Sequence, residues 1–325
     1  MVTVVVDASV EAEPQVAGRS LTRIAIDRLK KDRTFLISGS ILIVIVLIAI
    51  FAPAICSLLG VDPYSLDNSA IDDMGGQPIG PYGGVSADHP LGVEWGTGRD
   101  ILARLLYGLR ISLLVATLAT VLTVIIGTVL GIVSGYAGGK TDAVIGRLMD
   151  LILAFPFLLI ILALSGTLTQ RLTALGVPEG NPSRLTYLVL VLSIFGWPYL
   201  ARIVRGQVLS LREREFVESA VSIGTGTWRI LFTEILPNLW APILVYATLT
   251  LPTYIGTEAA LSFLGVGILP PEPSFGAMLA DSVQYFTQVP SYLFIPGTVL
   301  VIVVVTFNFV GDSIRDAIDP KASRS

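Results

Sequence analysis

The chain has 325 residues, of which 53% are hydrophobic and 14% are charged, and its formal net charge is −4 at pH 7. A water-soluble domain of this size would struggle to stay in solution with so much apolar surface, so the composition predicts an all-α polytopic membrane protein surrounded by lipid. The slightly acidic balance gives no reason to expect a nucleic-acid partner. The single cysteine, Cys56, can form no disulfide within the chain and is expected to be a buried apolar residue.

Six apolar segments are long enough to cross a bilayer, which needs about 20 mostly apolar residues. They are residues 35–59, 111–134, 143–168, 185–204, 239–258 and 292–310. If both termini are cytoplasmic, 16 Lys and Arg residues lie on the cytoplasmic side and five on the other. Because basic residues accumulate on the cytoplasmic side, the sequence predicts six transmembrane helices with cytoplasmic termini.

This topology divides the chain into five parts. They are a cytoplasmic tail (1–34), the first transmembrane helix (35–59), an extracytoplasmic loop (60–110), a five-helix core (111–311) and a second cytoplasmic tail (312–325). The core contains a cytoplasmic loop, 205–238, in which residues 212–223 are expected to form a short helix that ends at Gly224. One side of this helix is expected to carry Phe216, Val217, Ala220 and Val221, as a docking element would.

Proline and glycine mark several of the predicted spans. Prolines stand at positions 156, 198, 242, 252 and 296, where they either kink the helices for a moving pathway or reflect the general frequency of proline in membrane helices. Gly127, Gly131 and Gly135 are four residues apart and are expected to let another helix approach closely. These glycines indicate helix packing and imply no substrate.

Two patterns suggest chemistry that their context does not support. The string 134–141 ends in Gly-Gly-Lys-Thr like a phosphate-binding loop, but its first glycine is replaced by Ser134 and a membrane span precedes it where a strand is required. His89 is the only histidine and has no partner typical of a metal site, so a turn beside Pro90 is expected. Neither nucleotide nor metal is therefore assigned to this chain.

The cytoplasmic loop carries a more specific pattern. It consists of Glu218-Ser219-Ala220, three residues, Gly224, and then Leu236-Pro237. This resembles the E-A-A, three residues, G, then I-x-L-P loop by which permease subunits of bacterial ATP-binding-cassette importers engage their ATPases. Ser219 and Glu234 depart from that pattern without removing the helix or its glycine stop. The literal Glu258-Ala259-Ala260 has the wrong spacing to its glycine and is predicted on the outer side, so it is rejected.

Further stretches resemble the C-type permease subunits of dipeptide and oligopeptide importers. They lie at 89–92, 98–100, 105–113, 154–156, 261–265 and 307–320, so the resemblance covers about 23–320. It implies a type I importer permease fold in the bacterial cytoplasmic membrane. It also implies a homologous B-type permease partner, two ATPases that hold ATP and Mg, and an extracytoplasmic substrate-binding protein. This chain would then bind no cofactor and have no catalytic residue.

By the same resemblance, eight residues are expected to engage the ATPase or position the loop. They are Glu213, Phe216, Val217, Glu218, Ala220, Gly224, Leu236 and Pro237. A charge reversal or a bulky residue at Ala220 or Gly224 is expected to uncouple transport while the protein still inserts.

Asp150 and Glu258 are pathway or gating candidates, because ionisable groups in a span are costly and usually face a cavity or a partner. The solute stays open between dipeptides, longer peptides, nickel chelates and other small solutes. A self-contained secondary transporter would usually show internal repeats, and a membrane enzyme would show clustered His, Asp or Cys within the spans. Neither feature is evident in the sequence.

Overall fold

The computed structural model describes residues 21–318, which form helices joined by turns and loops. The predicted tail segments 1–20 and 319–325 lie outside the described residues. The longer helices are α1 (Leu21–Leu29), α2 (Arg33–Leu59), α3 (Ile101–Ala137), α4 (Gly139–Ala154), α5 (Phe157–Ala174), α6 (Asn181–Leu211), α7 (Glu215–Ser222), α9 (Trp240–Phe263), α10 (Phe275–Ser282) and α11 (Pro290–Ile318). Short elements are η1 (Asn68–Ala70), α8 (Thr227–Arg229), η2 (Ile230–Ile235) and η3 (Leu236–Asn238).

Five of the described helices are long and apolar enough to cross a membrane, namely α2, α3, α5, α6 and α11. A sixth crossing results if Thr227–Asn238 and Trp240–Phe263 are taken together as one span bent by 61°. Each predicted span therefore overlaps one of these helices. The helical membrane fold expected from hydropathy is confirmed.

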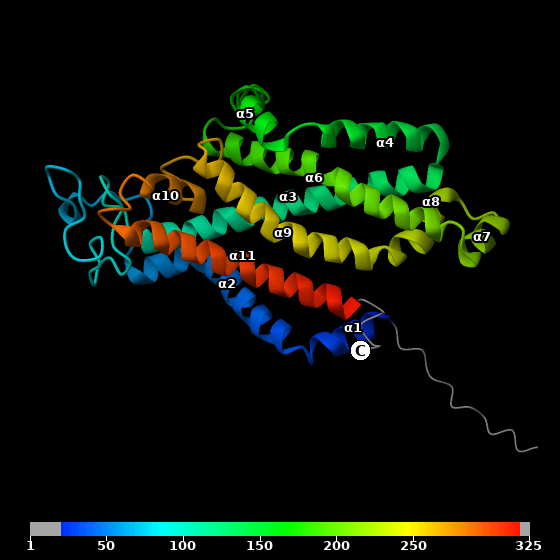
Figure 1. Cartoon of the computed structure of the whole chain (residues 1–325), viewed down its shortest axis with the longest axis horizontal. Coiled ribbons are helices and arrows are strands. Elements are labelled where there is room, and N and C mark those ends of the chain that lie inside the picture. The colour runs from blue at the N-terminus through cyan, green and yellow to red at the C-terminus, as the bar shows by residue number, and fades with distance from the viewer. Residues whose placement is uncertain (1–20, 319–325) are drawn as a thin grey trace, which may run out of the picture.

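The third predicted span, 143–168, is not one helix. The structure ends α4 at Ala154 and begins α5 at Phe157, with Phe155 in an extended conformation at φ −81° and ψ 137°. Proline disfavours the helical conformation of the residue before it and offers no amide to continue the ladder, which explains the break at Pro156. Figure 1 shows α4 running along the bundle and α5 seen nearly end-on.

The second span is longer than predicted, because α3 begins ten residues before position 111. The Asp100 carboxylate accepts a hydrogen bond from the amide of Ala103 at 2.7 Å and so caps the start of the helix. The loop predicted to be extracytoplasmic consequently ends at position 100, and we call residues 60–100 the cap. Arg104, expected in the loop, lies in the first turns of α3.

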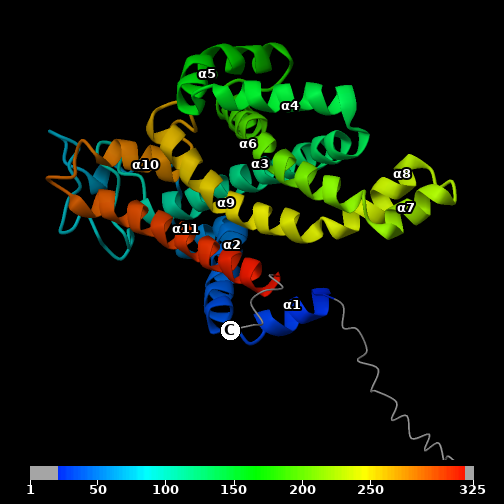
Figure 2. The ribbon, with the colours of Figure 1, turned by 45° about the vertical axis from the view of Figure 1, so that its right-hand side comes forward.

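The two ends of the bundle carry different elements. In Figures 1 and 2, α1, α7 and the end of α11 lie toward one end, which we call the α7 end, and the cap lies at the other. The guanidinium of Arg28 in α1 donates to the carbonyl of Ala317 in α11 at 3.3 Å, which joins the first and last described helices. This placement agrees with an even number of crossings.

The close pair of helices at the centre is α3 with α6. A Cβ added at Gly127, Gly131 or Gly135 would lie 2.7–2.9 Å from a Cβ of Leu200, Val204 or Val208, respectively. Only glycine allows this approach of the two backbones, so the predicted role of these glycines in packing is confirmed. The two helices therefore form a tightly packed unit that leads directly toward α7.

Candidate functional site

The short helix α7 lies at the tip of the α7 end and is bounded as the sequence suggests. It spans Glu215–Ser222, four residues shorter than predicted, and Gly224 follows it with φ +76°. The amide of Gly224 donates to the carbonyl of Val221 at 2.9 Å, and that of Thr225 to Ala220 at 3.0 Å. This pair of bonds is a Schellman ending, so the predicted glycine stop is confirmed.

The four apolar residues expected on one side of α7 do fall within one arc of the helix, but they differ in burial. Val217 is 2% exposed and Ala220 is also buried, and both belong to a core cluster that includes Leu200 and Ile230. Phe216 and Val221 are exposed and, at about 100° per residue, fall at the two edges of this buried stripe, whereas Glu215, Glu218, Ser219 and Ser222 form the opposite side. One face thus anchors α7 to its own chain and the other is free to meet a partner.

This division changes the expected role of Ala220. A charge there would disturb the anchoring contacts before any partner is involved, so the residue does not report on docking. A Cβ added at Gly224 would have no atom within 4 Å, yet the positive φ of this position strains any other residue. Substitutions at both positions therefore act first on the conformation of the loop.

The exposed side of α7 is acidic and apolar together. Glu213 and Glu218 are exposed, as is Ile223 at 82%. A shallow hollow of about 550 Å³ is lined by Glu215, Glu218, Ser219, Ser222 and Ile223. Such a surface suits a partner groove that offers both apolar contacts and basic side chains.

The second half of the loop completes this surface. Leu236 packs against the core cluster that holds α7, whereas Pro237 is exposed in η3. Trp228 is 72% exposed and stacks on the exposed Phe232, with ring centroids 6.1 Å apart. Sequence analysis missed Ile223, Trp228 and Phe232. The two aromatic residues four positions apart in a predicted polar loop are the signal that could have found the pair.

The two pathway candidates have different surroundings. Asp150 is exposed on α4 and accepts a hydrogen bond from the guanidinium of Arg202 in α6 at 2.6 Å. Glu258 is fully buried between α3 and α9, where the hydroxyls of Ser112 and Ser262 donate to its carboxylate at 2.5 and 2.7 Å. Glu258 therefore joins two helices and faces no described cavity. Its role in a pathway or gate stays a prediction.

The largest described cavity, of about 680 Å³, lies beside α6 and α9. Its lining comes from the end of α4, the start of α5, α6, α9 and Arg315. Polar lining residues include Tyr246, Thr250, Thr253 and Thr257. Neither Asp150 nor Glu258 is among the lining residues. Sequence analysis missed this set because all of its polar members except Arg315 are uncharged.

The two motifs that the sequence analysis rejected, 134–141 and 258–260, lie in structural contexts that do not suit the functions they resemble. The string 134–141 spans the last residues of α3, the turn at Gly138 and the start of α4, so a helix precedes it instead of a strand. Glu258-Ala259-Ala260 lies in the last turns of α9, at the opposite end of that helix from α7 (Figure 1). Among the described residues, no group of three or more His, Cys, Asp and Glu is arranged to hold a metal ion.

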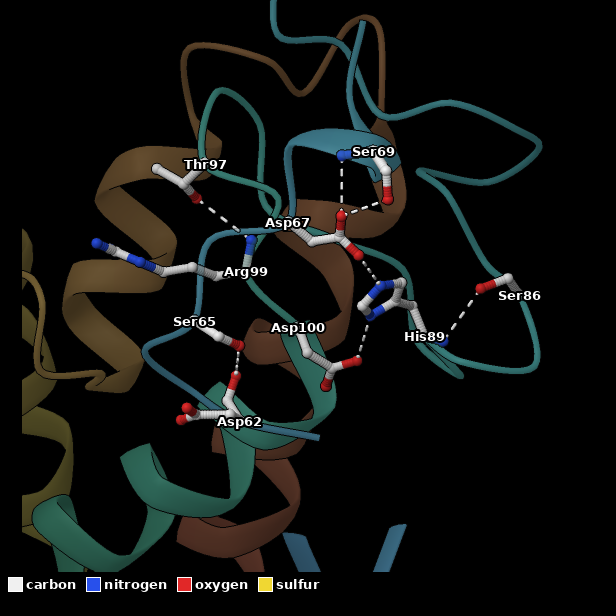
Figure 3. Close-up of polar contacts among 9 residues, drawn as sticks. All are labelled: Asp62, Ser65, Asp67, Ser69, Ser86, His89, Thr97, Arg99 and Asp100. Atoms are coloured by element: carbon white, nitrogen blue, oxygen red, sulfur yellow. Dashed lines mark hydrogen bonds and ion pairs between the residues drawn. The ribbon is translucent and has the colours of Figure 1, made fainter. Parts of the chain in front are cut away.

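The cap contains a polar site that sequence analysis read as a simple turn. The two ring nitrogens of His89 lie 2.9 Å from a carboxylate oxygen of Asp100 and 3.2 Å from one of Asp67 (Figure 3). Burial opposes protonation of the ring, but the hydrogen bonds to Asp100 and Asp67 outweigh it and raise the pKa of His89. The ring thus joins η1, its own loop and the start of α3.

Comparison with known proteins gives the family of the chain. Residues 127–324 match the model of the binding-protein-dependent transport system inner membrane component. The chain belongs to this family. Residues 20–78 also match the N-terminal transmembrane domain of oligopeptide transport permease C.

Curated relatives resemble nearly the whole chain. The dipeptide transport system permease protein DppC of Alkalihalophilus pseudofirmus is 38% identical over 95% of this chain and 93% of its own length. The oligopeptide transport system permease proteins OppC of Bacillus subtilis and Escherichia coli are 37% and 38% identical, over 93% and 94% of this chain and 90% and 93% of their own lengths. The predicted resemblance to C-type permease subunits is confirmed, and the chain is a permease subunit of the importer class.

Solved structures support the fold. A chain of the MetNI methionine ABC transporter in an inward-facing conformation superposes with a TM-score of 0.52 at 20% identity, covering 66% of this chain and 96% of that chain. A second inward-facing crystal form gives a TM-score of 0.53 at 19% identity, covering 67% and 98%. The predicted type I importer permease fold is therefore confirmed.

Proposed function

We propose that this chain is the C-type permease subunit of an ATP-driven importer of dipeptides or oligopeptides. The family match and the names of the DppC and OppC relatives support this assignment. The chain itself forms part of the translocation pathway, and ATP hydrolysis takes place on separate subunits. Nickel chelates and other small solutes are the alternative cargo for the same subunit type.

The proposed complex contains three kinds of protein partner. A homologous B-type permease completes the pathway, two ATPases hold ATP and Mg, and an extracytoplasmic protein delivers the solute. The α7 end faces the cytoplasm, so that both termini and α7 lie on the side of the ATPases. This orientation agrees with the excess of Lys and Arg in the segments at that end.

The observation that carries the proposal is the division of α7 into two faces. Val217 and Ala220 fix the helix to the core formed by the end of α6 and by η2, while Phe216, Val221 and Ile223 remain uncovered. A helix held on one side and bare on the other is suited to a groove in another protein. The acidic Glu213 and Glu218 would border that contact.

Transport would follow from unequal affinity of the ATPases for two arrangements of the permease pair. ATP closes the ATPases, which displaces α7 in their groove, and the bundle alternates between inward and outward access. Nucleotide can shift this equilibrium only by binding the two arrangements differently. The contact at α7 is the place where that difference enters this chain.

The substitution Ile223→Asp tests the docking role. It places a charge in the uncovered face at an exposed position, so we expect the stability of the chain to change by less than about 0.5 kcal/mol. Uptake of a labelled dipeptide by the complete transporter in liposomes should fall by about fivefold to 150-fold. Uptake, ATP hydrolysis and co-purification of the ATPases are measured together.

Ile223→Leu serves as the matched control, because it keeps an apolar side chain at the same position. We expect the control to transport normally. Normal uptake by Ile223→Asp would contradict the docking role of α7. Uptake of a nickel chelate in place of dipeptides and longer peptides would leave the subunit type intact and overturn the proposed cargo.

A further inference from the structure

The helix that leads to α7 is joined to α4 by two ion pairs. The Arg205 guanidinium in α6 donates twice to Asp142 in α4, with Nε–Oδ1 and Nη2–Oδ2 distances of 2.5 and 2.6 Å. The Ser134 hydroxyl donates to the same carboxylate at 2.5 Å. Hydrogen bonds from Arg205 and Ser134 lower the pKa of Asp142 to about 2, so this carboxylate stays charged at neutral pH.

The second ion pair lies further along both helices. Arg202 in α6 donates to Asp150 in α4 at 2.6 Å, and both side chains are about half exposed. The two pairs border a hollow of about 480 Å³ whose lining also includes Arg147. An exposed pair adds little to stability by itself. Its two partners nevertheless lie on different helices, so the pair constrains the position of α4 relative to α6.

Apolar contacts alone hold α4 weakly. Only Ile145 and Met149 of this helix are buried, and their cluster contains Trp197 and Ala201 of α6 and the partly buried Ile126, Leu130 and Val133 of α3. Another neighbour of α6, α3, is by contrast joined to it along three glycines. The ion pairs are therefore the principal directional contacts between α4 and α6 in the described structure.

The far end of α4 forms part of a cavity wall. Ile152, Leu153 and Phe155 line the cavity of about 680 Å³ beside α6 and α9. At the other end, only residues 212–214 separate α6 from α7, and the guanidinium of Arg212 donates to the carbonyl of Gly135 at 3.2 Å. A displacement of α7 thus acts on the end of α6 and on the α3–α4 turn together.

We propose that the ion pairs Arg205–Asp142 and Arg202–Asp150 make α4 move with α6, so that displacement of α7 carries the cavity wall at Ile152, Leu153 and Phe155. This inference rests on the proposed docking role of α7. Asp142, Asp150, Arg202 and Arg205 act as positioning residues, and none of them needs to touch the solute. The competing arrangement is that α6 slides past a stationary α4 during each transport cycle.

Removal of the charges on α4 is the first test. The double variant Asp142→Asn with Asp150→Asn keeps the side-chain shapes and removes both charges. We expect the complex to assemble and hydrolyse ATP, while peptide taken up per ATP hydrolysed falls by about fivefold to 150-fold. Exchange of the exposed pair, Asp150→Arg with Arg202→Asp, should retain most of the uptake that Asp150→Arg alone loses. An unchanged ratio in the double Asn variant would overturn the proposal.

A covalent link tests the same inference without relying on weakened contacts. Asp150→Cys and Arg202→Cys are joined by a short cleavable bismaleimide in a Cys56→Ala background, which removes the native cysteine. If α4 and α6 move together, the linked transporter should keep its uptake. Loss of uptake on linking, with recovery on cleavage, would show that the helices must separate and would overturn the proposal.

The two proposals fail in different ways. Normal uptake by Ile223→Asp would contradict the docking role of α7, regardless of the uptake measured for the cross-linked protein. Loss of uptake in the linked protein, with Ile223→Asp inactive as expected, would leave the docking role in place and exclude the joint movement of α4 and α6.

Discussion

The two ends of the bundle differ in which side chains they bury and which they expose. In the cap, Glu94 is buried beside Arg104 of α3, which is also buried, and the Tyr292 hydroxyl donates to Glu94 at 3.0 Å. At the α7 end, the apolar side chains of Ile223 and Trp228 are largely exposed. At the cap, buried Glu94 forms ion pairs with Arg99 and Arg104 of the same chain, although Nε of both arginines and Nη2 of Arg104 make no hydrogen bond to the described residues, whereas the α7 end leaves apolar side chains exposed.

This difference indicates that the cap is stabilised by contacts within the chain, whereas the α7 end is an interface for another protein. A buried, internally paired network resists change and holds the cap to α3 and α11. Exposed aromatic and aliphatic side chains gathered on one loop mark a surface that another protein covers. Substitutions in the cap should therefore affect stability first, and substitutions on the bare side of α7 should affect transport first.

The largest expected effect is at Arg104, which is fully buried in α3. Its guanidinium donates to the carbonyl of Pro271 at 3.1 Å and lies 3.4 Å from Glu94. Arg104→Ala leaves the Glu94 carboxylate buried without this partner, so we expect a loss of about 3–5 kcal/mol in the free energy of unfolding. The transition temperature of the assembled transporter in detergent measures this loss.

Arg110→Ala is the control for this prediction, because Arg110 is an exposed residue of the same helix. Its effect should stay within about 0.5 kcal/mol. Equal transition temperatures for the Arg104 and Arg110 variants would show that the buried network does not stabilise the cap.

A smaller effect is expected from the same substitution at two neighbouring positions of α7. Val217→Asn buries an amide in the core cluster and should cost about 1–3 kcal/mol of stability. Phe216→Asn, at the exposed edge of the helix, should cost less stability than Val217→Asn but reduce peptide uptake. Thermal unfolding and uptake are measured on both variants. If Phe216→Asn destabilises the chain as much as Val217→Asn, the two-faced description of α7 is wrong.

The sequence predicted the parts of this structure that depend on local chemistry. Hydropathy located the spans, and the pattern from Glu218 to Pro237 located the loop that contains α7. Gly224 could be recognised as the helix stop because glycine alone adopts its φ of +76° without strain. Each of these conclusions needs only residues close together in the chain.

The effect of each proline could not be predicted from its own segment. Pro156 separates α4 from α5, whereas Pro198, Pro252 and Pro296 lie inside continuous helices. A proline removes one amide donor in every case. Whether the helix continues depends on neighbours that pack around the gap, and those neighbours come from distant segments.

The roles of the charged residues depended on contacts over still longer distances. Arg104 was counted with the external loop, yet its partner at Pro271 is 167 residues away. Glu258 was expected at a pathway, but Ser112, 146 residues earlier, and Ser262 satisfy its carboxylate. Only Ser262, four residues further along α9, could have been read from the sequence as a partner.

The smallest expected effect concerns the pH dependence of the cap at His89. A neutral ring can donate from only one nitrogen, whereas both nitrogens face carboxylate oxygens, so the protonated ring satisfies Asp67 and Asp100 together. Although burial lowers the pKa of His89, the two carboxylates raise it above the usual 6.5 in the folded chain. The stabilisation is therefore complete below about pH 6.5 and is lost as the pH rises through the folded value.

Because the chain has one histidine, selective isotope labelling gives an NMR signal from His89 alone in a protein purified without a histidine tag. We expect its titration midpoint above 6.5, and Asp67→Asn should move the midpoint downward by removing one of the two negative charges. The exposed Asp73→Asn variant in the same cap is the control and should leave the midpoint unchanged. A midpoint at or below 6.5 in the unmodified protein would mean that burial outweighs the carboxylates. The cap would then be held by the Arg104 network without a contribution from a charged His89.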